Sequence, residues 1–234
     1  MEVYTTLEEF SPLSSSVITI GSYDGLHRGH FHIINRMKSI AHSLKTVSVV
    51  LTFNPHPRYI VDSSASSLGL IMSMEKKIDI FRKLNIDNLI ILKFNEILMK
   101  INAETFMNDI LVKYFNPKYI VAGHNHHFGH KKSGNVKFLK DYCKNNKIGH
   151  EIVEPISDGK NVISSTNIRK LIANGFIRRA NFELGSIFGF NAINESITID
   201  FPDPTLSAKT PKLILDETLY LLSSFINISL IIRF

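Results

Sequence analysis

Cysteine and tryptophan are nearly missing from this chain of 234 residues, which has one cysteine, Cys143, and no tryptophan. A single cysteine excludes a disulfide within the chain and fits a reducing compartment, so we expect a cytoplasmic protein. The first residues are acidic and contain no apolar run, so we expect no signal peptide. The apolar stretch 219–234 includes serine, asparagine and arginine and is shorter than the roughly 20 residues that span a bilayer. We therefore expect no membrane partner.

The chain also lacks a cluster of positive charge. Basic residues outnumber acidic ones by 27 to 21, which gives a net charge of +6, but apart from the pairs 76–77 and 131–132 the lysines are spread along the chain. Aromatic residues are not interleaved with them as in an RNA-binding sheet. The pattern predicts solvated surface lysines, no nucleic-acid partner, and acidic, phosphate-bearing small ligands.

Apolar runs rich in β-branched residues alternate with segments of helical periodicity as far as residue 155. The predicted strands are 17–20, 46–53, 88–94, 118–122 and 151–155, and the predicted helices are 31–44, 74–84, 103–114 and 135–145. This alternation predicts right-handed strand–helix–strand units, and hence an α/β, Rossmann-like fold with a parallel sheet covered on both faces. Such sheets bind ligands beyond the carboxyl ends of their strands.

Residues 21–30, GSYDGLHRGH, connect the first predicted strand to the first predicted helix. A helix N-terminus directs backbone N–H groups and a positive dipole end at an anion. His27 and His30 add two imidazole donors, and Gly29 between them has no Cβ to keep a phosphate from the backbone. Asp24 could order the turn or help to hold Mg²⁺, and the Asp-Gly turn habit favours the first role. The alternative is a plain turn with two solvated histidines, but the complete Gly-x-x-Asp-Gly-x-His-x-Gly-His string favours a phosphate site.

Three other segments carry polar or rigid groups at predicted element ends. Residues 163–169, ISSTNIR, place hydroxyls at a helix N-terminus and an arginine one turn later, which suits either anion binding or a plain N-cap. Residues 51–58, LTFNPHPR, end a strand where two prolines fix the backbone. Residues 123–129, GHNHHFG, contain histidines but no cysteine, acidic residue or His-x-x-x-His helix pair, so we expect no bound metal there.

Together these four segments resemble the signature of a known family. The string at 21–30 is similar to that of the His-x-Gly-His nucleotidyltransferases, and most of all to the FMN adenylyltransferase half of bacterial bifunctional riboflavin kinase/FAD synthetases. The segments at 51–58, 123–129 and 163–169 resemble that family's Thr-Phe-x-Pro-His-Pro, Gly-x-Asp-x-x-Phe-Gly and Ser-Ser-Thr-x-Ile-Arg patterns. All four lie in the family's order, and the resemblance covers about residues 15–185.

The resemblance implies transfer of AMP from ATP to FMN to give FAD and pyrophosphate, with Mg²⁺ accompanying ATP. It also implies three groups of site residues. The residues expected to act in catalysis are His27, His30 and Arg169. The residues expected to bind ATP are Gly21, Ser22, Tyr23, Asp24, Gly25, Gly29, Ser164, Ser165 and Thr166. The residues expected to bind flavin are Phe53, Asn54, Pro55, His56, Asn125 and Phe128.

Asn125 departs from the family pattern, which usually has aspartate at this position. Asparagine keeps an acceptor oxygen but loses the charge, so hydrogen bonding to flavin is expected to persist and any role with Mg²⁺ to weaken. Two alternatives stay open: a nucleotidyltransferase with another phosphorylated acceptor, such as phosphopantetheine or nicotinamide mononucleotide, and a flavin- or nucleotide-binding relic without turnover. The segment at 51–58 argues against the first, and intact His27, His30 and Arg169 argue against the second.

The composition changes after residue 185. We expect residues 1–185 to form the adenylyltransferase domain, and residues 186–234, with short apolar runs separated by prolines, to form a β segment. In the resembled family a riboflavin kinase barrel begins here, but its Gly-x-Pro-Thr-Ala-Asn run is not found in residues 186–234, which predicts a truncated remnant without kinase activity. The strand edges of an unclosed barrel predict cover by the first domain or by a second copy of the chain in a homo-oligomer.

Overall fold

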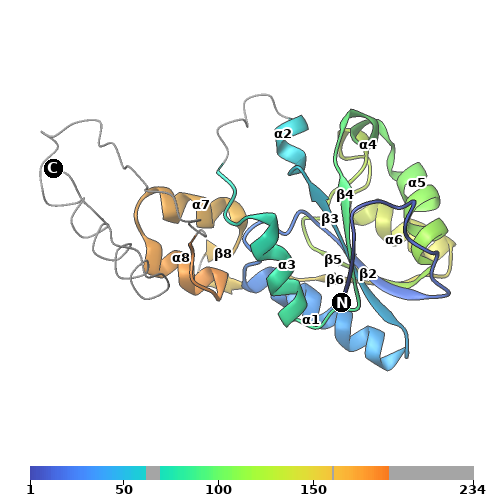
Figure 1. The fold of residues 1–234 in the computed structure, drawn as a ribbon, viewed down its shortest axis with the longest axis horizontal. Helices are drawn as coiled ribbons and strands as arrows, with labels where there is room; N and C mark the ends of the chain where they lie inside the picture. Colours follow the sequence, from blue (N-terminus) through green and yellow to red (C-terminus); the bar gives the residue numbers. More distant parts are fainter. Residues whose placement is uncertain (62–68, 160, 190–234) are drawn as a thin grey trace, which may run out of the picture.

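The computed structural model describes residues 1–61, 69–159 and 161–189, which form a six-stranded sheet with helices on both faces (Figure 1). All six strands are parallel, in the order β1-β4-β3-β2-β5-β6. The strands are β1 Glu2–Tyr4, β2 Ser16–Ile20, β3 Val47–Asn54, β4 Asn88–Lys93, β5 Pro117–Gly123 and β6 Gly149–Val153. The predicted α/β fold is confirmed. The β segment predicted at 186–234 lies outside the described residues except for 186–189, so the division of the chain at residue 185 stays a prediction.

Helices connect the strands, and a small hairpin follows the sheet. The helices are α1 Arg28–Ser43, α2 Pro57–Val61, α3 Met74–Lys83, α4 Glu96–Lys100, α5 Ala103–Thr105, the π-helix η2 Phe106–Phe115, the 3₁₀ turn η3 His130–Lys132, α6 Val136–Asn145, α7 Ser165–Ala173 and α8 Ile177–Leu184. The hairpin strands are β7 Ser157–Asp158 and β8 Asn161–Val162. No helix in the described part of the chain is both long and apolar enough to cross a membrane.

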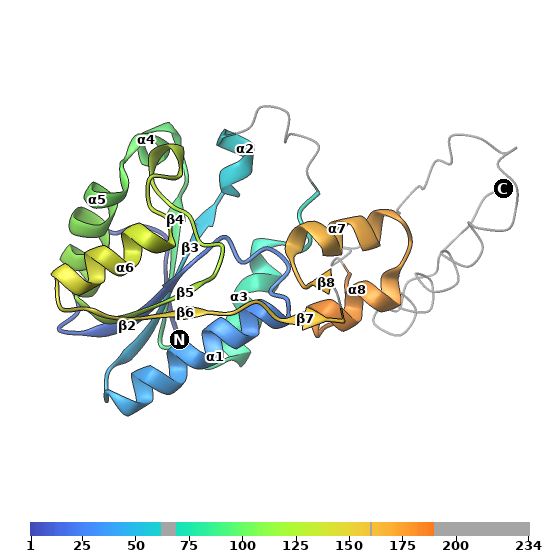
Figure 2. The ribbon, with the colours of Figure 1, turned by 180° about the vertical axis from the view of Figure 1, so that it is seen from behind.

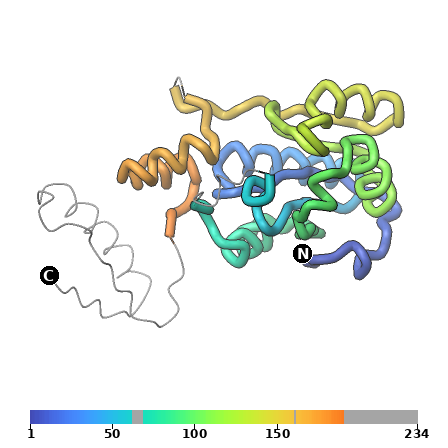
Figure 3. Tube along the Cα trace, turned by 90° about the horizontal axis from the view of Figure 1, so that it is seen from above, coloured from blue at the N-terminus to red at the C-terminus, as the bar shows by residue number. Residues whose placement is uncertain are grey.

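The core has one layer on each face of the sheet, because neighbouring residues of a strand point to opposite sides. In β2, Ile18 and Ile20 pack with residues of η2 and α6, whereas Val17 packs with residues of α1 and α3. Figure 3 shows the two edges of the sheet, with the N-terminus on one side and the yellow segment of α6 and β6 on the other.

Helices α7 and α8 pack on each other beyond the end of the sheet at which β2 leads into α1 (Figures 1 and 2). A small separate core joins them to the rest of the molecule. Its buried residues are Ile71, Ile163, Ile168, Ala180 and Leu184. A Cβ on Gly25 would lie 3.0 Å from the Ile71 side chain and 3.2 Å from that of Leu184, so this core supports the loop after β2 directly.

Two predicted elements differ in detail from the observed ones. The strand predicted at 151–155 begins at Gly149, which pairs with Tyr119 of β5. A Cβ on Gly149 would lie 2.2 Å from the Tyr119 ring, so glycine is used here to make room for that ring, although glycine alone disfavours a strand. The helix predicted at 103–114 is α5 followed by η2, whose wider π-helical turns periodicity does not distinguish from α-helical ones.

Candidate active site

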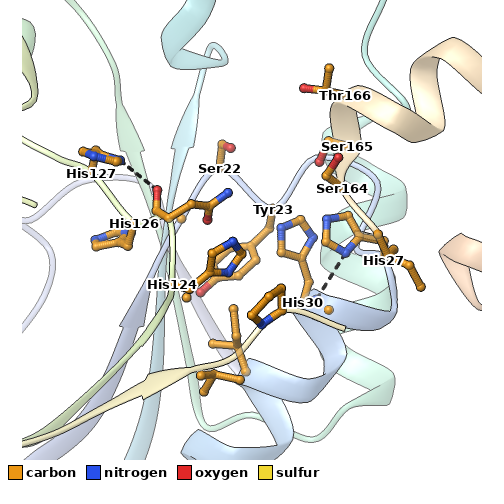
Figure 4. A pocket seen from close by; sticks show the side chains of 18 of the residues that line it. Ser22, Tyr23, His27, His30, His124, His126, His127, Ser164, Ser165 and Thr166 are labelled. Atoms are coloured by element: carbon orange, nitrogen blue, oxygen red, sulfur yellow. Dashed lines mark hydrogen bonds between the residues drawn. The ribbon is translucent and has the colours of Figure 1, made fainter. Parts of the chain in front are cut away.

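The strand order reverses at β2. Strands β3 and β4 are added on one side of β2, and the later strands β5 and β6 on its other side. In sheets of this type ligands bind beyond the carboxyl ends of the strands at such a switch point. A cavity of about 430 Å³ opens there (Figure 4). Its walls come from the segments that follow β2, β3, β5 and β6 and from the start of α7.

Most of the predicted site residues surround this one cavity. Those that line it are Gly21, Ser22, Tyr23, His27, Gly29, His30, Phe53, His56, Asn125, Phe128, Ser164, Ser165, Thr166 and Arg169. Those that do not line it are Asp24, Gly25, Asn54 and Pro55, the last two of which are joined by a cis peptide bond. Four segments that are far apart in the sequence therefore meet at the place where the fold predicts a ligand.

His27 ends the loop after β2 and His30 lies in the first turn of α1. Their rings are stacked, with centroids 3.6 Å apart and planes inclined by 17°. His27 is also the N-cap of α1, because its Nδ1 accepts a hydrogen bond from the His30 backbone N–H over 3.4 Å (Figure 4). The neutral His27 ring therefore carries its proton on Nε2. Gly29 makes this arrangement possible, since a Cβ there would lie 3.2 Å from the His27 ring.

Both imidazoles are neutral at pH 7. Burial lowers the pKa of His27 to about 4. The pKa of His30 is well below its ordinary value because of burial and, to a lesser extent, electrostatic repulsion by His27 and Lys77. The buried Nδ1 of His30 has no hydrogen-bond partner among the described residues. A bound ligand would satisfy this nitrogen, since buried polar atoms are nearly always paired.

The loop after β2 is fixed from beneath by buried groups. Tyr23 has a φ of +48°, and its hydroxyl lies 2.7 Å from Thr19 Oγ1. Lys77 donates from Nζ to the carbonyl oxygen of Ser22 over 2.7 Å and is 5% exposed. The general expectation of solvated surface lysines therefore does not extend to Lys77. Lys77 shares the buried face of α3 with Phe81, and a charged residue in a helical pattern gives no sign that it faces inward.

Asp24 is 1% exposed and links the loop to two other segments. Its carboxylate accepts a hydrogen bond from the backbone N–H of Ile71 over 3.0 Å and forms an ion pair with the guanidinium of Arg169. Arg169 also donates from Nε to the carbonyl of Gly69 over 2.9 Å, and Ser165 Oγ donates to the carbonyl of Asp24 over 2.8 Å. These contacts favour the turn-ordering role of Asp24, because its carboxylate is already engaged.

Helix α7 begins at the cavity with three hydroxyl side chains. Ser164 is its N-cap and accepts a hydrogen bond from the backbone N–H of Asn167 over 3.3 Å. Ser165 and Thr166 follow in the first turn, and all three hydroxyl residues line the cavity (Figure 4). The capping role and an anion-binding role are therefore compatible at this helix N-terminus.

The segments after β3 and β5 supply an aromatic wall. Phe53 of β3 is half-buried and meets the ring of Phe94 edge-on. Phe128 is buried against the ring of Phe106 of η2, with centroids 5.5 Å apart. Asn125 is exposed, and its backbone carbonyl oxygen lies 2.8 Å from Nδ1 of a neighbouring histidine, His127. The wall thus combines flat apolar rings with the exposed amide side chain of Asn125.

The cavity is rich in nitrogen donors and poor in acids. Burial lowers the pKa of both His56 and His126 to about 4. Glu154 is the only acidic residue among the described residues that line the cavity. Nowhere in residues 1–61, 69–159 and 161–189 do three His, Cys, Asp or Glu side chains come together in a way that could hold a metal ion. This chemistry suits an anionic ligand.

The chain is similar in sequence to two curated proteins. The chain is 33% identical over 180 residues to the bifunctional riboflavin kinase/FMN adenylyltransferase of Buchnera aphidicola subsp. Schizaphis graminum, and spans 57% of that protein's length with 76% of its own. It is 30% identical over 197 residues to the FAD synthetase of Listeria monocytogenes, with 84% of this chain and 79% of that protein aligned.

Solved structures agree on the architecture. The crystal structure of a macrolide-efflux protein from Streptococcus pneumoniae superposes with a TM-score of 0.70 at 27% identity, over 80% of this chain and 70% of that one. This likeness concerns the fold. The family described as FAD synthetase matches residues 10–167, which is more than half of the chain, so this protein belongs to the FAD synthetase family.

Proposed function

We propose that this protein is an FMN adenylyltransferase, which transfers the AMP unit of ATP to FMN and releases pyrophosphate. One observation carries the proposal beyond family membership. Two stacked, neutral imidazoles lie at the N-terminus of α1, at the switch point of a parallel sheet, and one of them has a buried nitrogen with no hydrogen-bond partner among the described residues. Anionic groups bind at such helix N-termini.

In this reaction a phosphate oxygen of FMN attacks the α-phosphorus of ATP. The bond from the α-phosphorus to the oxygen that bridges to the β-phosphorus breaks, and pyrophosphate leaves with that electron pair. No enzyme nucleophile is needed, so the protein contributes position and stabilisation of negative charge. We assign His27 and His30 to the triphosphate, with His27 donating from Nε2, and Arg169 to the same oxygens as a fixed positive charge.

In the proposed complex, ATP and FMN lie against different walls of the cavity. We place ATP against the loop after β2 and the start of α7, where hydroxyls and glycines allow close approach. We place the isoalloxazine ring of FMN against Phe53 and Phe128, with the Asn125 amide as a hydrogen-bond partner. Mg²⁺ enters with ATP, since Glu154 is the single carboxylate among the described lining residues and phosphate oxygens are its natural ligands.

Three wider predictions belong with this proposal. We propose that residues 1–185 form the adenylyltransferase unit, that the protein works in the cytoplasm, as its single cysteine suggests, and that its partners are the small molecules ATP and FMN, with no nucleic acid. A homo-oligomer is expected only if a second copy covers the strand edges predicted in residues 186–234.

The test is incubation of the purified chain with FMN, ATP and Mg²⁺, followed by chromatography. We expect FAD and pyrophosphate in equal amounts. Phosphopantetheine and nicotinamide mononucleotide serve as competing acceptors, and preferential adenylylation of either would replace FMN with another acceptor. Tight flavin binding without turnover would show a non-catalytic relic and overturn the proposal.

A further inference from the structure

We propose that Lys77 is a positioning residue for adenylyl transfer, whose buried ammonium group holds the loop after β2 in the shape that receives the triphosphate. This inference rests on the proposed function. Lys77 does not line the cavity, and it acts on the substrate through the Ser22 carbonyl and through His30.

The geometry around the Ser22 carbonyl is the first observation. Lys77 Nζ donates to this oxygen over 2.7 Å, and Thr52 Oγ1 donates to it over 3.3 Å. Two side chains from separate elements, α3 and β3, therefore converge on one peptide group. Lys77 and Thr52 are 5% and 0% exposed, so water does not replace either donor.

This peptide group controls the shape of the loop. A trans peptide directs its C=O and the following N–H to opposite sides, so fixing the Ser22 carbonyl toward α3 turns the Tyr23 N–H away from Lys77. Tyr23 itself has a φ of +48°, a backbone conformation that is unfavourable for a residue with a side chain. Such a conformation persists only when neighbouring contacts hold it, and the Lys77 hydrogen bond is one of them.

The charge of Lys77 is the second observation. The charged or titratable groups that interact with it are Asp24 in the loop, His30 in α1 and His56 after β3, while Asp24 is in turn paired with Arg169 of α7. Burial lowers the pKa of Lys77 to about 8, and the Asp24 carboxylate opposes this shift. The ammonium form is therefore present at pH 7, repels a proton from His30 and adds positive potential beneath the phosphate site.

The neighbouring lysine provides a matched control. Lys76 precedes Lys77 on α3 but donates to the carbonyl oxygens of Ile187 and Gly189, on another side of the helix and away from the loop. Lys76→Met and Lys77→Met are the same chemical change one position apart. Only Lys77→Met removes a charge from beneath the Ser22 carbonyl.

The experiment measures kcat/KM for FAD formation between pH 6.5 and 9.5 in the wild type, Lys77→Met, Lys77→Arg and Lys76→Met. We expect Lys77→Met to lose roughly 10- to 100-fold at pH 7, the range that corresponds to one hydrogen bond from a charged donor. Wild-type kcat/KM should fall above about pH 8, where Lys77 of the free enzyme loses its proton. Lys77→Arg should keep more activity than Lys77→Met and show no such fall, because a guanidinium does not deprotonate there.

Tyr23, Cys143 and the substrate phosphates do not explain an alkaline fall near that pH. Burial raises the pKa of Tyr23 and raises that of Cys143 to about 11. Phosphate groups complete their ionisation near pH 6. The flattened profile of Lys77→Arg is therefore a signature that a purely structural lysine would not produce.

The outcomes separate the inference from the function on which it rests. A wild type that forms no FAD overturns both. If the wild type is active, two results overturn the Lys77 inference alone. One is a kcat/KM of Lys77→Met within twofold of the wild-type value, and the other is the same alkaline fall of kcat/KM in Lys77→Arg. Circular dichroism and thermal unfolding check that each variant folds; if Lys77→Met does not fold, the pH profile of Lys77→Arg decides.

Discussion

As the N-cap of α1, His27 accepts a hydrogen bond from the His30 backbone at Nδ1, which leaves the ring proton on Nε2. Its pKa of about 4 keeps the ring neutral at pH 7, so His27 is a donor of fixed direction and not a variable charge. Lysine or arginine at this position could not cap the helix, because neither side chain has an acceptor atom. The helix end and the proposed phosphate site therefore favour the same residue type.

Replacing His27 or His30 should lower turnover strongly while leaving the fold intact. We expect His27→Ala and His30→Ala each to lower kcat by roughly 100-fold or more, because both are proposed to stabilise charge that develops in the transition state. His32→Ala is the matched control, since His32 is exposed on the same helix and does not line the cavity. FAD production is the measurement, and near-normal rates in both active-site variants would refute the catalytic assignment.

Acid should destabilise the protein through His27. His27 binds a proton near its ordinary pKa of 6.5 when unfolded but only near 4 when folded, so in between the unfolded state holds more protons and stability falls as pH falls. From pH 7 to pH 5 the loss is on the order of 2 kcal/mol for this group. His27→Asn keeps a capping acceptor without titrating, so urea unfolding at the two pH values should show a smaller loss than in the wild type. An equal loss would show that His27 does not carry this dependence.

At the scale of elements, the loop between β5 and α6 depends on its docking against α5. Backbone hydrogen bonds join Phe128 and Gly134 in both directions, at 2.8 and 2.9 Å, and the N–H of His130 donates to the carbonyl of Ile101 over 2.7 Å. Gly129 has a φ of +71°, and a Cβ there would lie 2.7 Å from the backbone nitrogen of Ala103. This close approach holds Phe128 at the cavity wall.

Two glycines with positive φ test that contact. Gly129→Ala should cost about 2–4 kcal/mol, since it adds a clash with α5 to the strain of a backbone, at φ 71° and ψ 166°, that essentially only glycine adopts. Gly159→Ala, at a φ of +62° with nothing within 4 Å of its Cβ, should cost about 1 kcal/mol from strain alone. Thermal or urea unfolding measures both. Equal losses would mean that packing against Ala103 contributes nothing.

The sequence was informative wherever a feature is local. Periodicity predicted α1 and β2 because their buried residues recur within one element, and the GSYDGLHRGH string indicated residues that line the cavity because both histidines lie in one turn. It was silent on the Arg169–Asp24 ion pair and on the Lys77 contact, which join residues 145 and 55 positions apart. Such contacts depend on how α7 and α3 pack, which no local pattern encodes. Strand β1 was missed for another reason, since three edge residues are too few to show alternation.

At the scale of the whole molecule, the cavity is an assembly of distant segments that a few buried polar contacts hold in register. Asp24 ties the loop after β2 to α7 and to the segment before α3, and the core of α7 and α8 packs against Gly25. The sheet supplies the switch point, and these contacts set the shape of the loop above it. The electrostatic character of the cavity follows from the same burial, which holds four of its histidines neutral at pH 7: His27, His30, His56 and His126.

Neutral histidines leave most of the charge of a triphosphate uncompensated, which leads to a prediction about Mg²⁺. The permanently charged side chains among the described lining residues are Arg58, Arg169 and Glu154, and Arg169 is already paired with Asp24.

We therefore expect FAD formation to cease in excess EDTA and to return when Mg²⁺ is added beyond the chelator, because the cation must travel with ATP. Chromatography for FAD in both conditions measures this, and full activity in excess EDTA would contradict it. Elemental analysis of the purified protein is the control: stoichiometric zinc would mean that the histidines of the loop after β5 bind a metal, and that the EDTA effect has a different cause.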